Sequence, residues 1–195
     1  FTQTIDEHGN QVAHYTTTDF DKLPLQLMCD ENGEALRVQV EFPGRPVQLK
    51  IWKARAGHIC LYLLDSDLPG NEETDRAITY QLYGGDINTR IQQEIVLGIG
   101  GVRALHLLGL EPTAWHINEG HAAFQILERC RELVTGGLDF ASALEQVAGA
   151  TVFTTHTPVP AGHDIFEHSL VATYFTDYVD QLGVTMQDFL ALGTS

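Results

Sequence analysis

The second half of the chain repeats one pattern, in which a short apolar strand gives way to a polar, histidine-bearing segment and a helix follows. TAWHIN is followed by GHAAFQILERCRELVTGG, and ATVFTTHT, read as a buried strand, is followed by HDIFEHSLVATYFTDYVDQLG. FASALEQVAGA, between the two strands, also reads as a helix. This order predicts a parallel sheet with crossover helices. Ligands of such sheets bind beyond the carboxyl ends of the strands, so the two polar segments are expected to share one site.

The first third of the chain carries β-strand signals. Apolar and polar residues alternate around the turns PGRP and AG, which places Val38, Val40 and Phe42 on one strand face and Val47, Leu49 and Ile51 on another. We predict a β-rich segment over residues 1–70, packed on the same domain as an α/β segment over residues 71–195. The expected fold class is α/β, with a Rossmann-like parallel sheet and flanking helices.

Between these parts, DINTRIQQEIVLGIGGVRALHLLG is predicted to be one long helix. Its apolar stripe consists of Ile87, Ile91, Ile95, Ile99, Val102 and Leu105. The GIGG at residues 98–101 lacks the GxGxxG spacing of a dinucleotide loop and lies inside the helix. Close packing of the helix against a neighbour is therefore the favoured reason for these glycines.

Composition narrows the function classes. The net charge of −15 argues against a nucleic-acid partner, which needs a basic surface. No apolar run is long enough to cross a membrane. Three well-separated cysteines, Cys29, Cys60 and Cys130, fit a reducing cytoplasm better than a disulfide framework. The chain opens at Phe1 without an initiator methionine, so we expect a piece of a longer protein.

The first polar segment, INEGH, allows more than one interpretation. Asn118 or Glu119 can cap the following helix, but capping explains neither His116 nor His121. The two histidines are five residues apart, whereas the zinc motif HExxH needs four along one helix face. We therefore expect no metal site here.

The second polar segment, TTHTPVPAGHD, places His156 at a strand end before two prolines that stiffen the loop. A histidine fixed there can exchange hydrogen bonds with a substrate hydroxyl, although backbone partners alone also satisfy many histidines. His163 and His168 are assigned to that structural class, one as a helix cap and one on the solvent face.

A third segment, YGGDINTR, precedes the long helix. Asp86 or Asn88 can cap this helix, and capping is the favoured reading for either residue alone. The same loop also presents several hydrogen-bonding groups to a polyhydroxyl ligand.

Three stretches, YGGDINTRIQQEIVLGIGGVRAL, WHINEGHAAF and FTTHTPVPAGHDIF, together resemble the α-glucan (glycogen, starch, maltodextrin) phosphorylases, in particular their bacterial branch. The resemblance runs from about Leu61 to the end and is loose over the first sixty residues. It implies a fragment of the amino-terminal domain of a two-domain glycosyltransferase fold. The implied reaction is reversible transfer of a terminal α-1,4-linked glucosyl unit to inorganic phosphate, giving glucose 1-phosphate with retention.

The resemblance also implies roles for individual residues. His156 matches the catalytic histidine that contacts the glucosyl unit, and Glu119 matches the acidic residue that orients it, where animal-type members have Asp. Asn118 and His121, in the same motif, are assigned to substrate binding. Asp86 and Asn88 lie near the substrate-gating loop of the family and are assigned to the substrate as well.

The family cofactor is pyridoxal phosphate, whose 5′-phosphate assists as a proton relay. Its lysine belongs to a second, carboxyl-terminal domain, and none of Lys22, Lys50 and Lys53 lies in a matching motif. The implied partners are α-1,4-glucan, phosphate, that second domain and a possible second copy of the chain, and the fragment alone is expected to be inactive. Two alternatives stay open: a non-catalytic module that binds carbohydrate or protein, and a metal-dependent hydrolase using His116, His121 and His156.

Overall fold

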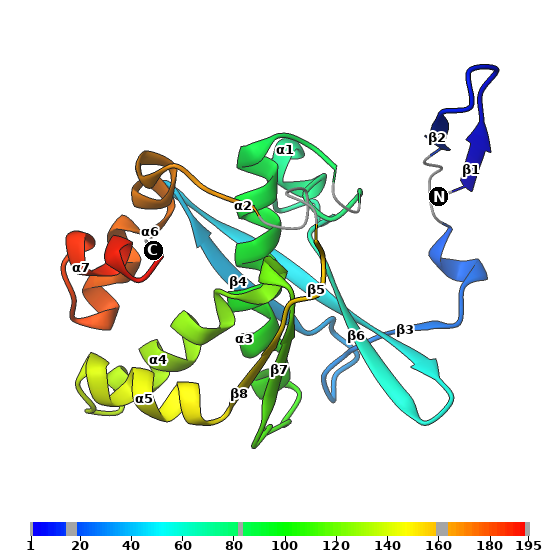
Figure 1. The fold of residues 1–195 in the computed structure, drawn as a ribbon. Helices are drawn as coiled ribbons and strands as arrows, with labels where there is room; N and C mark the ends of the chain where they lie inside the picture. Colours follow the sequence, from blue (N-terminus) through cyan, green and yellow to red (C-terminus); the bar gives the residue numbers. More distant parts are fainter. Residues whose placement is uncertain (1, 15–18, 82–83, 159–163, 194–195) are drawn as a thin grey trace.

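The structure, a computed structural model, describes residues 2–14, 19–81, 84–158 and 164–193. Strands and helices mix around a hydrophobic core that takes side chains from the central sheet, the long helix and the carboxyl-terminal helices (Figure 1). A separate hairpin of β1 (Thr2–Ile5) and β2 (Gln11–His14) stands apart from the rest in Figure 1.

The central sheet is antiparallel and is built on its longest strand, β5 (Arg45–Ala56). Its partners are β3 (Leu25–Leu27), which follows the short helix η1 (Phe20–Lys22), and β4 (Arg37–Phe42) and β6 (Ile59–Asp65). The predicted inward faces are confirmed: the buried residues are Val38, Val40, Phe42, Val47, Leu49 and Ile51. Alternation of apolar and polar side chains produces this result because successive residues of a strand point to opposite faces.

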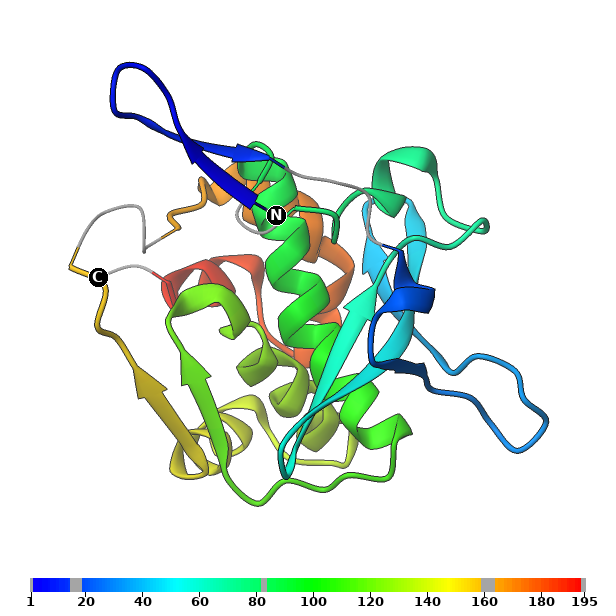
Figure 2. The ribbon, with the colours of Figure 1, turned by 90° about the vertical axis from the view of Figure 1, so that its right-hand side faces the viewer.

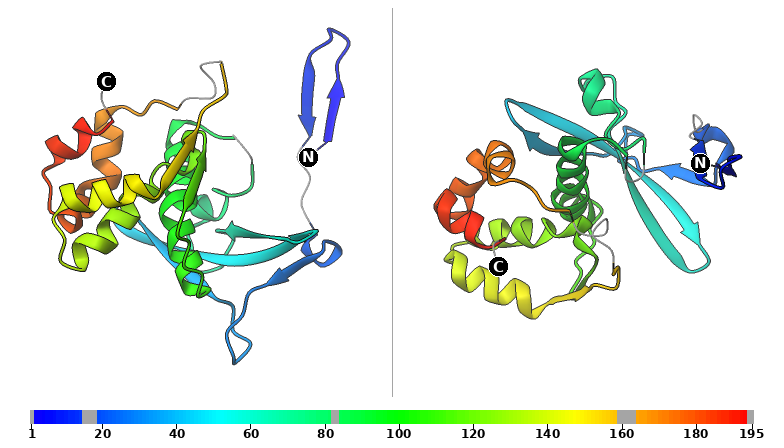
Figure 3. Two further views of the ribbon diagram at one scale, coloured as in Figure 1. Left: turned by 60° about the horizontal axis from the view of Figure 1, so that its bottom comes forward. Right: turned by 45° about the horizontal axis from the view of Figure 1, so that its top comes forward.

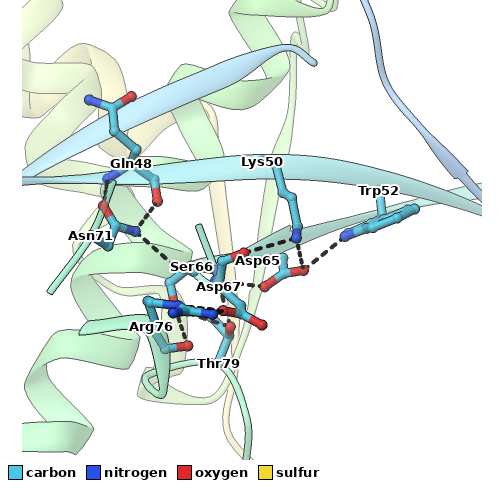
Figure 4. Close-up of polar contacts among 9 residues, drawn as sticks. All are labelled: Gln48, Lys50, Trp52, Asp65, Ser66, Asp67, Asn71, Arg76 and Thr79. Atoms are coloured by element: carbon cyan, nitrogen blue, oxygen red, sulfur yellow. Dashed lines mark hydrogen bonds and ion pairs between the residues drawn. The ribbon is translucent and has the colours of Figure 1, made fainter. Parts of the chain in front are cut away.

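The segment that leads from β6 to the long helix is fastened to β5 by polar side chains (Figure 4). Asn71, which is buried, accepts from Gln48 N at 2.9 Å and donates to the carbonyls of Gln48 and Ser66. Asp65 receives hydrogen bonds from Trp52 Nε1 at 3.0 Å and contacts Lys50 Nζ at 3.1 Å. The short helix α1 (Glu73–Arg76) is tied to the same segment, since Ser66 Oγ donates to the carbonyl of Arg76 at 3.2 Å and Arg76 Nε donates to Asp67 Oδ1 at 2.6 Å.

The predicted long helix is present as three consecutive parts: α2 (Ile87–Ile95), a π-helical turn η2 (Val96–Gly100) and α3 (Gly101–Leu107). In Figure 2 this helix stands between the antiparallel sheet and the strand pair β7–β8. A Cβ added at Gly98 would lie 2.8 Å from Gln125 N, and one at Gly100 would lie 2.9 Å from Leu49 Cδ1. The packing interpretation of GIGG is therefore confirmed for Gly98 and Gly100, whereas a Cβ at Gly101 would meet nothing within 4 Å. Of the apolar stripe, Ile87 is exposed because it is the first helical residue.

The two predicted short strands form a parallel pair, β7 (Trp115–Asn118) and β8 (Thr151–Thr154), side by side in Figure 2. The connection runs through η3 (Gly120–Ala122), α4 (Gln125–Thr135) and α5 (Phe140–Gly149), and α6 (His168–Leu182) and α7 (Met186–Ala191) follow β8. The fold is thus a mixed helix-and-sheet structure with one parallel strand pair among the described residues. The prediction that β8 is buried is wrong, since Val152 is 59% and Phe153 54% exposed. Among the described strands β8 pairs only with β7, so its outer side stays uncovered.

The helices α4, α5, α6 and α7 lie together on one side of the molecule (Figure 3), and one buried carboxylate there bonds to side chains of α3, α4 and α6. Glu128 on α4 is fully buried and binds Arg103 Nε at 2.7 Å, Arg131 Nη2 at 2.6 Å and the hydroxyl of Tyr178 at 2.7 Å. Burial raises the pKa of Glu128, but the hydrogen bonds from Arg131 and Arg103 outweigh it and lower the pKa to about 2. Glu128 therefore remains a carboxylate that joins α3, α4 and α6.

Candidate functional site

The junction between β7 and η3 is a strained turn at Glu119. Glu119 has φ 60° and ψ −170°, and among the described residues it alone combines a side chain with positive φ. This backbone region is populated almost only by glycine and costs about 1–3 kcal/mol. Glu119 N donates to the carbonyl of Thr154 at 2.8 Å, which continues the parallel pairing one residue past β7. The strained turn directs the Glu119 side chain into the protein, where the residue is only 3% exposed.

The Glu119 carboxylate fastens the start of the segment after β8. Its Oε1 accepts from His156 N at 2.9 Å, Thr157 N at 2.8 Å and Thr157 Oγ1 at 2.7 Å. These hydrogen bonds, led by that from His156 N, lower the pKa of Glu119 to about 2, so the group is anionic at neutral pH. Its second oxygen, Oε2, is buried without a hydrogen-bond partner among the described residues. The expectation that Asn118 or Glu119 caps the next helix is wrong, because neither side chain bonds to the amide groups of η3.

His156 contacts the last residue of β7, Asn118, and the residue that follows it, Glu119. Its Nδ1 lies 3.3 Å from Glu119 Oε1, and its Nε2 lies 3.0 Å from Asn118 Oδ1. Its side chain is 62% exposed, so one face of the imidazole is open. The structure thus brings Asn118, Glu119 and His156 together at the carboxyl ends of two parallel strands, where an α/β site is expected.

His121, on η3, belongs to a neighbouring cluster around Arg90. Arg90 Nη2 lies 3.3 Å from His121 Nδ1 and 2.6 Å from Asp164 Oδ2, and Arg90 Nη1 donates to Gln93 Oε1 at 2.8 Å. Glu94 Oε1 is 3.8 Å from the same guanidinium. The cluster therefore joins α2, η3 and the segment before α6.

The pKa values of two carboxyl groups in this cluster are shifted in opposite directions. Burial, with the neighbouring Asp164, raises the pKa of Glu94 to about 8. Burial also acts against ionisation of Asp164, but the Arg90 hydrogen bond and charge outweigh it and lower the pKa of Asp164. At neutral pH the pair therefore carries one proton, on Glu94, and one negative charge, on Asp164, which Arg90 neutralises.

The three histidines of the hydrolase alternative do not converge. Where the structure describes the chain, the group with metal-ligand spacing consists of Glu94, His121 and Asp164, whose ligand atoms lie within 4.8 Å of one another. His116 is exposed and bonds to Thr154 Oγ1 at 2.7 Å instead. A zinc site built from His116, His121 and His156 is therefore not what this geometry provides.

Asp86 and Asn88 lie at the start of α2, one turn before Arg90. Asp86 caps the helix by accepting from Thr89 N at 2.9 Å, which confirms the capping interpretation, and these bonds lower the pKa of Asp86. Asn88 is exposed in the first turn. Among the described residues, no hydrogen bond connects either one to Glu119 or His156. They lie beside the two clusters rather than within them.

Four residues of these clusters were not singled out from the sequence: Arg90, Glu94, Thr157 and Asp164. Arg90 and Glu94 follow the i,i+4 spacing of a helix pair, which is a usable signal, but Asp164 lies 74 residues away from Arg90 along the chain. His168 is exposed at the start of α6 without acting as its cap. His163 lies outside the described residues.

Comparison with known proteins adds independent information. No protein-family model matches the chain. The chain is 40% identical over 193 residues to a maltodextrin phosphorylase of Thermococcus litoralis, a match that covers 99% of this chain and 23% of that protein. It is 47% identical over 184 residues to a glycogen phosphorylase of Mycobacterium tuberculosis (91% and 21%) and 32% identical over 173 residues to one of Aquifex aeolicus (89% and 25%).

These matches extend the resemblance to the β-rich first sixty residues, since the first of them covers 99% of the chain. The chain spans between a fifth and a quarter of the length of the relatives it matches. Three relatives from different organisms match nearly the same extent of this chain. Over almost its whole length the chain is therefore similar to glycogen and maltodextrin phosphorylases, of which it corresponds to one segment.

Proposed function

We propose that this chain is a segment of an α-glucan phosphorylase, an enzyme that transfers a terminal α-1,4-linked glucosyl unit to inorganic phosphate. The observation that carries the proposal is the arrangement of Glu119 and His156, in which a buried anion fixes a half-exposed histidine at the mouth of two parallel strands. The names of the similar proteins, glycogen and maltodextrin phosphorylase, support the substrate class. We further propose that residues 71–195 form part of a Rossmann-like domain, on which residues 1–70 pack.

In this proposal each cluster has its own task. His156 contacts the glucosyl unit with its open face, while Glu119 and Asn118 fix its ring from either side. The anionic Glu119 beside the ring adds negative charge to the site, which suits a reaction in which positive charge develops on the sugar carbon. His121, with Asp86 and Asn88 at the start of α2, is assigned to the rest of the bound sugar.

The lysines of the chain do not fit the cofactor of the family, pyridoxal phosphate, which binds covalently to a neutral lysine amine. Lys50 Nζ is engaged by Asp65 at 3.1 Å and by the carbonyl of Asp67 at 2.9 Å, so it already has partners within the chain. Lys22 is exposed beside Asp19, and Lys53 lies on β5 opposite Gln26 of β3. We therefore expect the cofactor, the second domain and the complete active site to involve other parts of the polypeptide.

The proposal is tested with a full-length protein that contains this segment, loaded with cofactor and supplied with maltodextrin and phosphate. Glucose 1-phosphate is the expected product, and its absence from an intact, loaded enzyme would refute the proposal. In the same enzyme, His156→Ala should lower turnover by roughly 100-fold or more, the usual cost of losing a group that stabilises developing charge. His168→Ala, on an exposed histidine of α6, is the matched control and should leave turnover unchanged. Equal losses in the two variants would contradict the assignment of His156.

A further inference from the structure

Arg129, on α4, is a buried cation whose hydrogen-bond partners are all neutral. It is only 9% exposed, and its Nη1 donates to Thr151 Oγ1 at 2.7 Å and to Gln125 Oε1 at 3.3 Å. Its guanidinium carbon lies 4.7 Å from the centre of the Trp115 ring, which carries no charge either. Burial of a charge costs free energy unless an opposite charge accompanies it, and burial lowers the pKa of Arg129 for this reason.

Other partly buried cations of the chain do have a carboxylate within 3.1 Å. These ion pairs are Arg45 with Asp75, Lys50 with Asp65, Arg90 with Asp164, and Arg103 and Arg131 with Glu128. Glu132, on the same helix as Arg129, acts on it through its charge. The Glu132 carboxylate, however, contacts His106 Nδ1 at 3.0 Å, and no ion pair joins it to Arg129 among the described residues. Arg129 therefore differs from these cations in lacking a counter-ion of its own.

The kind of group missing beside Arg129 is a hydrogen-bond acceptor. A guanidinium has five N–H donors, and in the described part of the chain only those of Nη1 have partners. Gln125, which is 5% exposed, adds a second donor without a partner there, its Nε2. The fully buried atoms without a partner do not include Nε or Nη2 of Arg129, so both nitrogens remain accessible at the surface of the chain. A carboxylate fits them because its two oxygens match the planar fork of a guanidinium.

Arg129 lies at the amino-terminal end of the strand pair, whereas the site described above lies beyond the carboxyl-terminal end. Trp115 and Thr151, its two contacts there, are the first residues of β7 and β8 and pair with each other. Among the described strands β8 pairs only with β7, and it is the outer strand of the pair in Figure 2. Phe153 points to the same face as Thr151, two residues before it, and is 54% exposed. A partner that covers this edge therefore meets an apolar surface with a cation at its start.

We propose that Arg129 and the outer side of β8 bind an apolar segment of the same polypeptide, outside these 195 residues, which places an aspartate or glutamate carboxylate against Arg129. The chain spans between a fifth and a quarter of the length of its relatives, so a full-length protein has ample further chain to supply such a segment. This surface is separate from the proposed sugar site, and the inference does not rest on the proposed reaction.

The first test asks whether Arg129 binds a carboxylate, with formate as the probe. Formate is titrated into the 195-residue chain against chloride at equal ionic strength, and the side-chain N–H signals of Arg129 and Trp115 are followed by nuclear magnetic resonance. Both signals should move saturably with formate only, and in Arg129→Met the Trp115 signal should no longer respond. Arg45 Nε, which already binds Asp75 at 2.6 Å, is the internal control and should not respond. Equal responses to the two anions, or no response to either, would overturn the assignment of Arg129 to a carboxylate.

The second test identifies the source of the carboxylate. Phenylglyoxal modifies accessible guanidinium groups, and peptide mass spectrometry locates the modified residues. Arg129 should be modified in the 195-residue chain and protected there by formate, with exposed Arg55 modified in both conditions. In the full-length protein, modification of Arg129 should be lost without any added anion, and unfolding in urea should restore it. If Arg129 of the folded full-length protein is modified unless formate is added, the site takes a small free anion and the proposed segment is refuted. Because no glucan or phosphate enters either measurement, failure of the proposed reaction and failure of this inference are told apart.

Discussion

Glu119 and Glu128 lie nine residues apart in the chain, and both are almost completely buried. They nevertheless bind different kinds of partner and stabilise different parts of the structure. Both carboxyl groups have a pKa of about 2. Glu128 is held by the side chains of two arginines and a tyrosine from three helices. Glu119 is held mainly by backbone N–H groups of one short segment, His156 and Thr157.

The difference indicates what each carboxylate can contribute. A buried carboxylate surrounded by cationic side chains joins whole helices, so its loss leaves buried charges behind in the core. A carboxylate that binds backbone amides fixes the position of a segment, and with it a neighbouring side chain. Glu128 therefore belongs to the framework, and Glu119 belongs to the site. Its unpartnered Oε2 and its strained backbone add to that distinction, since natural proteins keep such features mainly where function requires them.

The largest expected effect is that of Glu128→Ala. The substitution leaves Arg103 and Arg131 without their buried partner and should lower the free energy of unfolding by about 3–5 kcal/mol. For a chain of this size that corresponds to a fall in melting temperature on the order of 10 °C. Thermal unfolding followed by circular dichroism measures it. Glu145→Ala, at an exposed glutamate of α5, is the control and should change little. A loss no larger than that of the control would show that Glu128 is not part of the framework.

Substitution of Glu119 is expected to change the free energy of unfolding less than substitution of Glu128. It should change the surroundings of the His156 and Thr157 amide groups more strongly. Glu119→Gln keeps the shape of the side chain while removing the charge that the His156 and Thr157 amides face. The backbone amide signals of these two residues should move strongly in an NMR spectrum, and the melting temperature should fall less than in Glu128→Ala. Glu119→Gly should also be more stable than Glu119→Ala, because glycine adopts φ 60° without strain. If Glu119→Ala were more stable to unfolding than Glu119→Gly, the backbone at residue 119 would not be strained.

A further expected effect is a dependence of stability on pH, which has the opposite sign for Glu94 and for the other two carboxyl groups. The pKa of Glu94 rises from 4.5 to about 8 on folding, so the folded state binds the extra proton and stability should fall as pH rises through that interval. Glu119 and Glu128, with pKa lowered from 4.5 to about 2, contribute stability above pH 4.5 that is lost as pH falls toward 2.

Urea unfolding at a series of pH values checks both directions. Glu94→Gln, which cannot ionise, should flatten the curve between pH 4.5 and 8 and leave the acid limb unchanged. Glu73→Gln, on the exposed side of α1, should leave both limbs in place. A steep alkaline limb in Glu94→Gln would mean that another group titrates there.

Much of the fold was predictable because it follows local patterns. Alternating residues gave the faces of β4 and β5, and four-residue spacing gave the long helix, while the Asp86 cap follows from its position before that helix. The meeting of the two strand ends was predictable as well, since parallel strands place their carboxyl ends at one edge. The exposure of β8 was not, because an apolar strand looks the same in a sequence whether its outer side is covered or open.

Within the described ranges, none of the helices combines enough length with enough apolar character to span a bilayer. The acidic balance of the chain and its odd set of cysteines are properties of composition alone, and all three thiols are free. Composition, however, carries no information about which side chains meet.

The sequence by itself therefore determined the order of strands and helices, the two polar segments and the family to which they point. Only the tertiary structure decided which atoms act together. Glu119 meets the backbone of residues 37 and 38 positions away, and Arg90 meets Asp164 at a separation of 74. The physical reason is that sequence periodicity reports only neighbours along one strand or helix. Contacts between distant segments depend on the register of β7 with β8 and on the angle at which the chain leaves Glu119, and both are set by the packing of the whole chain.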